Sequence, residues 1–223
     1  MRDLPPDNGL DIRRLATIYD RTAAFYDTVV ADLQSSAKLA AIETLARQRG
    51  ERFLEVGAGT GWAFARIVAT SGSEGALGLD VAAGMIEVAR RRLQDEAGNG
   101  VAPLILGDAT ALPFADGAFD CLLITYTLEV LPTDAILPAL RECLRVLRPG
   151  GRAIALNLTP GEGGDAAMTS EWQQRFTTDP EAFGGARPLQ ASSLMQQAGF
   201  AEVLRTYVGP DWPSEVLMGI KPW

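Results

Sequence analysis

The stretch FLEVGAGTGW, residues 53–62, constrains the fold more than any other part of the chain. It opens with a short apolar run from Phe53 that is typical of a buried strand. The alternating glycines that follow allow a sharp turn and a close approach of ligand to backbone. Residues 62–69 then have helix-forming composition with apolar positions along one side. Strand, glycine turn and helix in this order predict a nucleotide-type site at the carboxyl end of a parallel strand.

The glycine spacing separates two classes of ligand. A dinucleotide-binding turn follows G-x-G-x-x-G, and its third glycine position is Trp62 counted from Gly57, or Phe64 counted from Gly59. The pattern present is E-x-G-x-G-x-G, which places Glu55 beside the turn. A carboxylate there repels a pyrophosphate and attracts the ammonium and sulfonium charges of S-adenosylmethionine. The turn therefore favours S-adenosylmethionine, although a purely structural glycine turn would share the pattern.

Acidic residues follow the next two predicted strands. Asp80 ends the strand predicted over 75–80 and lies 23 residues after Gly57 (80 − 57 = 23). This is close to the ~20-residue offset at which a carboxylate binds ribose hydroxyls. Asp108 follows the strand predicted over 101–107. A carboxylate at that strand end can accept the exocyclic amine of adenine, while the Ala109 amide donates to the ring.

Several blocks of the chain resemble class I S-adenosylmethionine-dependent methyltransferases. The glycine stretch resembles their first motif, and DVAAGMIEVAR and GDATALPFADGAFD resemble the blocks around the next two strand ends. The segment YDRTAAFYD, residues 19–27, is similar to the N-terminal entry of the ubiquinone and menaquinone methyltransferases and the bacterial phospholipid N-methyltransferases. In those families it folds over the cofactor as a lid. The resemblance implies a helical lid segment over 1–50 and a methyltransferase domain over 51–223.

The resemblance also implies a set of residues that bind S-adenosylmethionine. In these families the positions of Val81 and Met85 pack on adenine. The predicted cofactor-binding residues are Tyr19, Glu55, Gly57, Ala58, Gly59, Gly61, Asp80, Val81, Met85, Asp108, Ala109 and Thr125. Ordinary helix packing of Tyr19 and core packing of Met85 are alternative interpretations of those two positions.

Three residues are candidates for contact with the methyl acceptor. The apolar run 121–125 predicts a central strand, and in the resembling fold its tip faces the methyl group. Tyr126 stands at this tip, where many relatives carry a histidine, and Glu129 follows it. A carbon acceptor requires a base, for which Tyr126, Tyr26 and Glu129 are the candidates. Alternatively, Glu129 caps or pairs with an arginine.

The acceptor class is predicted from the N-terminal resemblance and from a long insert. The insert over 159–189 is rich in glycine but contains Trp172, Phe176 and Phe183, which suggest a cover for an apolar or lipid-like small molecule. Alternatively, these aromatics pack a surface loop onto the core. A polar natural product or amine acceptor, and a cofactor-binding regulatory protein without turnover, stay open as rival functions.

The order of elements predicts the fold class. An amphipathic helix from Asp11 carries apolar positions through Val29, and a second helix is expected over 36–47. Strands and helices then alternate through residue 160, and two strands over 201–208 and 214–221 are joined by a short turn. We expect an α/β, Rossmann-like, doubly wound sheet of seven strands, mostly parallel, with a C-terminal antiparallel hairpin.

Composition excludes several function classes. The formal net charge is −8, and residues 101–223 contain 8 basic and 14 acidic side chains, so no nucleic acid partner is expected. The absence of histidine excludes a Ser-His triad and a histidine-ligated metal, and we expect no metal site.

Cys121 and Cys143 lie in apolar segments and are expected to be core thiols. No apolar run approaches the ~20 residues of a membrane span, so we expect a cytoplasmic protein in which an apolar acceptor allows peripheral membrane contact. The oligomeric state is left open.

Overall fold

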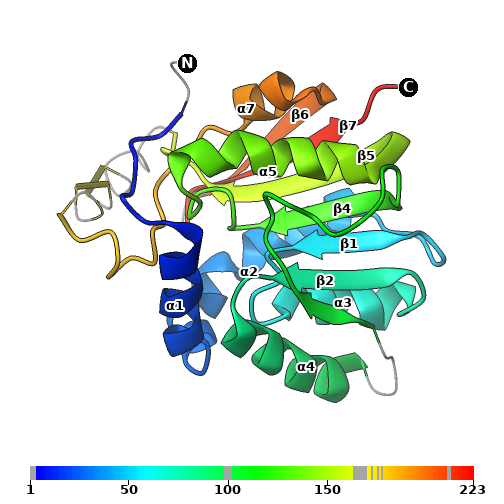
Figure 1. Cartoon of the computed structure of the whole chain (residues 1–223), viewed down its shortest axis with the longest axis horizontal. Coiled ribbons are helices and arrows are strands. Elements are labelled where there is room, and N and C mark those ends of the chain that lie inside the picture. Colours follow the sequence, from blue (N-terminus) through cyan, green and yellow to red (C-terminus); the bar gives the residue numbers. More distant parts are fainter. Residues whose placement is uncertain are drawn as a thin grey trace.

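One sheet of seven strands forms the centre of the molecule in the computed structural model (Figure 1). The structure describes residues 4–97, 102–162, 170–171, 173–174, 176, 178–209 and 212–223, with the backbone alone for 29–32. The strand order is β3-β2-β1-β4-β5-β7-β6. The strands are β1 (Phe53–Val56), β2 (Ala76–Asp80), β3 (Leu104–Leu106), β4 (Phe119–Thr125), β5 (Leu147–Leu158), β6 (Ala201–Val208) and β7 (Ser214–Ile220).

Strand direction follows the prediction. The pairs β1–β2, β1–β4, β2–β3 and β4–β5 are parallel, whereas β7 runs antiparallel to both β5 and β6. The predicted mostly parallel sheet with an antiparallel C-terminal hairpin is confirmed. Strand β1 lies between β2 and β4, so the chain reverses its winding direction there, and ligands of such sheets bind outside the carboxyl ends at this point.

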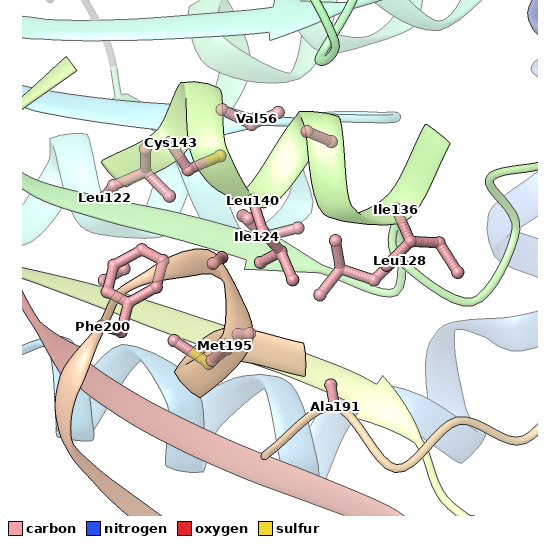
Figure 2. Close-up of a cluster of buried hydrophobic side chains, with 14 of the residues drawn as sticks. Val56, Leu122, Ile124, Leu128, Ile136, Leu140, Cys143, Ala191, Met195 and Phe200 are labelled. Carbon is pink, nitrogen blue, oxygen red and sulfur yellow. The ribbon is translucent and has the colours of Figure 1, made fainter. Parts of the chain in front are cut away.

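Helices cover both faces of the sheet. They are α1 (Ile12–Thr22), α2 (Tyr26–Leu45), α3 (Trp62–Ser71), α4 (Ala83–Ala97), α5 (Thr133–Val146) and α7 (Ser192–Ala198). Because successive side chains of a strand point to opposite faces, β4 supplies both cores. Leu122 and Ile124 pack with α5 and α7, as Figure 2 shows, while Cys121 and Leu123 join the cluster formed with α2, α3 and α4.

The N-terminal helices differ from the prediction. Instead of one helix from Asp11 to Val29 and another over 36–47, the structure has a break at 23–25 and then a continuous α2. Phe25, before α2, has a non-helical ψ of 3° and provides no side-chain cap. No glycine or proline marks this break. It is set by tertiary anchors, because Asp20 and Asp27 on either side of it bind two positions of α4, Gly84 in its first turn and Arg92 farther along.

Several smaller predictions have clear outcomes. Strand β5 begins at Leu147, directly after α5, because Leu147 already pairs with Phe119 of β4. Cys121 and Cys143 are buried free thiols, as expected. Trp172 and Val101 lie outside the described residues. None of the helices in the described segments combines the length and the apolar character that crossing a membrane requires.

Candidate cofactor and acceptor site

The glycine turn lies at the carboxyl end of β1, where β1 and β4 diverge. Gly57, Gly59 and Gly61 have φ values of +70°, +54° and +75°, the left-handed region that side chains disfavour. A Cβ at Gly57 would overlap Thr127, and a Cβ at Gly61 would lie 2.8 Å from the Ala89 Cβ of α4. A Cβ at Gly59 would meet nothing within 4 Å. Two of the glycines therefore serve close packing, and Gly59 leaves open space for a ligand.

Asp80, at the end of β2, holds the turn in place. Its Oδ2 accepts a hydrogen bond from the Gly59 amide at 2.8 Å, and its Oδ1 accepts one from the Ala82 amide at 2.9 Å. Burial raises the pKa of this carboxyl, while the amide hydrogen bonds act in the opposite direction. Each oxygen has a second lone pair that can accept a further hydrogen bond. Asp80 thus links the glycine turn to the start of α4 and can still accept hydroxyl groups.

These elements enclose one cavity, open to solvent, with about 880 Å³ of empty space. Most predicted site residues line it: Tyr19, Tyr26, Glu55, Gly57, Ala58, Gly59, Asp80, Val81, Met85, Asp108, Ala109, Thr125 and Tyr126. Gly61 and Glu129 are not among its lining residues. The fold therefore brings residues from β1, β2, β4 and the N-terminal helices together around one cavity. The roles proposed for these residues stay predictions.

Glu55 is a buried carboxyl on the cavity wall. It is fully buried, and its Oε1 accepts a hydrogen bond from Thr125 Oγ1 at 3.3 Å, whereas Oε2 has no partner among the described residues. Burial raises its pKa to about 8, and Lys38 acts in the opposite direction. A buried oxygen without a donor is costly, which is consistent with a ligand that supplies positive charge or a hydrogen bond.

The two tyrosines of YDRTAAFYD face the cavity, and its two aspartates anchor the segment. Tyr19 and Tyr26 have ring centroids 6.0 Å apart. Asp20 accepts a hydrogen bond from the Gly84 amide, in the first turn of α4, at 2.7 Å. Asp27 forms an ion pair with Arg92 at 2.7 Å. The repeated Tyr-Asp pair therefore aims each aromatic ring at the site while the neighbouring carboxylate fixes the backbone.

Tyr126 lies at the predicted strand tip in a left-handed conformation with φ of 50°. Its hydroxyl is 2.7 Å from Ser214 Oγ, and burial raises its pKa well above the usual range. Burial likewise raises the pKa of Tyr26. Both side chains are neutral phenols at physiological pH, and a role as proton acceptor would require a change of environment on ligand binding.

Glu129 is buried behind the cavity. Its Oε1 accepts from the Leu158 amide at 3.2 Å, and Oε2 has no partner among the described residues. Burial raises its pKa to about 8. Arg187 lies nearby and donates to the Glu129 backbone carbonyl at 2.8 Å. Within the described residues the Glu129 carboxylate accepts from a backbone amide and forms no ion pair with an arginine, and the role of Glu129 stays a prediction.

The remaining predicted cofactor residues form the wall toward β3. Asp108 Oδ1 accepts from the Thr110 amide and from Thr110 Oγ1, both at 2.8 Å, which fixes the carboxylate at the strand end. Met85 is buried and packs with Ala82 and Ala23, so its core-packing role is present beside its place on the cavity wall.

The two aromatic residues of the insert that the structure describes, Phe176 and Phe183, do not line this cavity. Phe176 is buried, with the Arg187 guanidinium 5.9 Å from its ring centroid, and neither it nor Phe183 contributes to the cavity wall. The apolar part of the wall is instead built by Ile12, Leu15, Val130 and Leu131. The prediction of an apolar acceptor therefore depends on these aliphatic residues and not on Phe176 or Phe183.

Sequence reasoning missed several lining residues, among them Gln34, Lys38, Thr60, Trp62 and Thr127. Gln34 and Lys38 lie one turn apart on α2, a spacing that places them on one face. The expected helix start at 36 excluded Gln34, and no family motif covers either residue. The available signal was a lysine between Ala37 and Leu39, in an otherwise apolar helical stretch.

Comparisons with known proteins agree with this geometry. Residues 53–151 match the model of a methyltransferase domain family. The chain is 37% identical over 155 residues to the ubiquinone/menaquinone biosynthesis C-methyltransferase of Cellvibrio japonicus, covering 66% of this chain and 60% of the relative. It is 34% identical over 188 residues to the demethylmenaquinone methyltransferase of Beutenbergia cavernae, covering 78% and 73%.

A solved structure supports the fold. A SAM-dependent methyltransferase from Thermotoga maritima superposes with a TM-score of 0.67 at 24% identity, covering 92% of this chain and 99% of that one. The chain spans 60% or less of the length of several curated relatives that it matches, and only 31% of a bifunctional biotin biosynthesis protein from Cellvibrio japonicus.

Proposed function

The chain belongs to the class I S-adenosylmethionine-dependent methyltransferases, and we propose that it transfers a methyl group to a small apolar acceptor of the quinone type. The observation that carries the proposal is the single cavity that joins the cofactor motifs to an aliphatic wall of Ile12, Leu15, Val130 and Leu131. The names of the ubiquinone/menaquinone and demethylmenaquinone relatives support the same acceptor class.

The residues present fit the family's cofactor. Open space at Gly59, the unpartnered oxygen of Glu55 and the absence of a third dinucleotide-type glycine at Trp62 favour a cationic nucleoside over a diphosphate. When bound, S-adenosylmethionine supplies an electrophilic methyl group on a positively charged sulfur. Asp80 would accept its ribose hydroxyls and Asp108 its adenine amine, with Val81 and Met85 beside the base.

In this proposal the protein promotes methyl transfer by holding the acceptor beside the methyl group and by excluding water from the site. Holding the acceptor beside the methyl group converts a bimolecular reaction into an effectively intramolecular one. Tyr26 would present a neutral hydroxyl group to the acceptor, since burial raises its pKa, whereas the Tyr126 hydroxyl is already hydrogen-bonded to Ser214 Oγ. Glu129 lies behind the wall, so we assign it no direct contact with the acceptor in this proposal.

We further propose that the N-terminal segment, with α1 as its leading element, is a lid. Tyr19 donates a hydrogen bond to the Gly184 carbonyl at 3.0 Å, and Arg14 forms an ion pair with Glu181. Helix α1 also contacts α4 through Asp20. The segment is therefore fastened on two sides of the cavity, and acceptor entry would require release of the exposed Arg14–Glu181 side.

The test is incubation of the protein with methyl-labelled S-adenosylmethionine and reduced naphthoquinone or benzoquinone acceptors, alongside a polar amine pool. We expect label in the organic phase, in a product one methylene heavier than the acceptor. Label confined to the aqueous phase would assign a polar acceptor instead. Heat released with S-adenosylhomocysteine, but no transfer to either pool, would assign a binding protein without turnover.

A further inference from the structure

A buried cation that no sequence motif marks lies on the α2 side of the cavity. Lys38 is only 7% exposed and lines the cavity. Its Nζ makes no hydrogen bond or ion pair within the described part of the chain. It lies over two aromatic rings, 5.5 Å from the Trp62 centroid and 5.8 Å from the Tyr126 centroid. A buried ammonium without a nearby anion is unfavourable, which is consistent with a bound ligand that supplies the anion.

The neighbouring charges leave this cation available. Asp27 is paired with Arg92, and Arg66 is paired with Glu96. Glu55 is the remaining nearby carboxyl, and it forms no ion pair within 4.0 Å of Lys38, although the two influence each other's pKa. Its Oε2 is itself without a partner. The cavity wall thus presents a basic side chain, Lys38, and an acidic side chain, Glu55, and each can still bind a group of a ligand.

A ligand group with a carboxylate and an ammonium on the same carbon offers a partner to each of these side chains. The cofactor of this family ends in such a group, the α-amino acid of its methionine part. Lys38 also lies at the correct end of the cavity, because Trp62 beneath it directly follows the glycine turn. The pairing would leave neither buried group unsatisfied.

We propose that Lys38 binds the α-carboxylate of S-adenosylmethionine and S-adenosylhomocysteine, while Glu55 Oε2 receives the α-ammonium. Lys38 is then the residue that makes the site selective for adenosyl amino acids over adenosine thioethers that lack the amino acid. The inference rests on the family's cofactor and is independent of the acceptor.

The test compares two ligands on two variants. Isothermal titration calorimetry measures binding of S-adenosylhomocysteine and of 5′-methylthioadenosine, which has the nucleoside and sulfur but no amino acid. Lys38→Met keeps an unbranched side chain that is one atom shorter and removes its charge. We expect it to weaken S-adenosylhomocysteine by about ten- to a hundredfold, the range of a charge-assisted hydrogen bond, and to change 5′-methylthioadenosine by less than about twofold.

The chain offers a matched control. Lys221 is its only other lysine, and its Nζ donates to the carbonyl groups of Arg145 and Leu147, outside the cavity lining. Lys221→Met should leave both affinities unchanged. Thermal unfolding checks that Lys38→Met is folded, which we expect because methionine suits a buried position.

The outcomes separate the possibilities. Equal weakening of both ligands by Lys38→Met would overturn the inference, since it would indicate general damage to the pocket. Unchanged affinity for S-adenosylhomocysteine would also overturn it, and loss of methyl transfer in that case would assign Lys38 to the acceptor. If the unmodified protein binds neither ligand, the cofactor assignment itself fails.

Discussion

Two glycines of one turn provide a matched test of what the turn is for. Gly59 and Gly61 both have positive φ, so Gly→Ala at either position carries the left-handed penalty of about 1–2 kcal/mol. They differ in surroundings. The new Cβ at 61 would lie 2.8 Å from the Ala89 Cβ and 3.0 Å from its Cα, whereas at 59 it would meet nothing within 4 Å.

The additional cost at Gly61 is that of overpacking, about 1–3 kcal/mol, because α3 and α4 must separate to admit the methyl group. The gain from stiffening the unfolded chain is the same for both variants and cancels in the comparison. Gly61→Ala should therefore be about 1–3 kcal/mol less stable than Gly59→Ala. For a urea m-value of about 2–3 kcal/mol/M, this separates the midpoints by about 0.3–1.5 M.

For ligand binding we expect the opposite order, with Gly59→Ala affected more than Gly61→Ala. Gly59 lines the cavity, so Gly59→Ala should weaken S-adenosylhomocysteine by at least about tenfold in calorimetry while the protein remains folded. Equal urea midpoints for the two variants would refute the assignment of Gly61 to helix packing. Unchanged affinity of Gly59→Ala would refute the assignment of Gly59 to the ligand.

Three further predictions follow from single contacts. Asp80→Asn should weaken S-adenosylhomocysteine by at least about tenfold in calorimetry, because the carboxylate is lost as an acceptor for hydroxyl groups; an unchanged affinity would remove Asp80 from the site. Asp27→Asn breaks a largely buried pair with Arg92, with side-chain exposures of 23% and 19%, and should cost about 1–2 kcal/mol in urea unfolding. Glu87→Gln, in a pair exposed by 53% and 72%, should cost less than about 0.5 kcal/mol, and equal losses would contradict the argument. Burial raises the pKa of Glu129 from 4.5 to about 8, so the fold favours its neutral form. This contribution is fully present below about pH 4.5 and is lost as pH rises toward 8; Glu129→Gln should flatten the fall in stability over that window, and an unaltered slope would count against it.

The order of elements could be predicted from the sequence because it depends on local chemistry. A few residues of sequence are enough to identify each of three features: the apolar run at 121–125, the glycine turn after β1 and the acidic residue at the end of β2. Few topologies can connect parallel strands in this order, so the seven-stranded sheet could be predicted from the order of the elements. Several residues that line the cavity were predictable for the same reason, because they lie at strand ends.

The helix break at 23–25 could not be predicted in this way. Residues 22–26 contain no glycine or proline, and their apolar spacing continues through the break. What ends α1 is distant: the Gly84 amide binds Asp20 and Arg92 binds Asp27, 64 and 65 residues away in the chain. Propensity is a weak constraint, and such tertiary contacts override it.

By itself the sequence determined the class of fold, the cofactor and the residues at the strand ends, because strand periodicity and turn chemistry operate over short distances. Only the tertiary structure decided which face of α2 meets the cavity, and so brought Lys38 opposite Glu55. It also placed Glu129 behind the wall and bound the Tyr126 hydroxyl to Ser214, 88 residues away. Burial and charge pairing depend on everything packed around a side chain, and that information is not local to any motif.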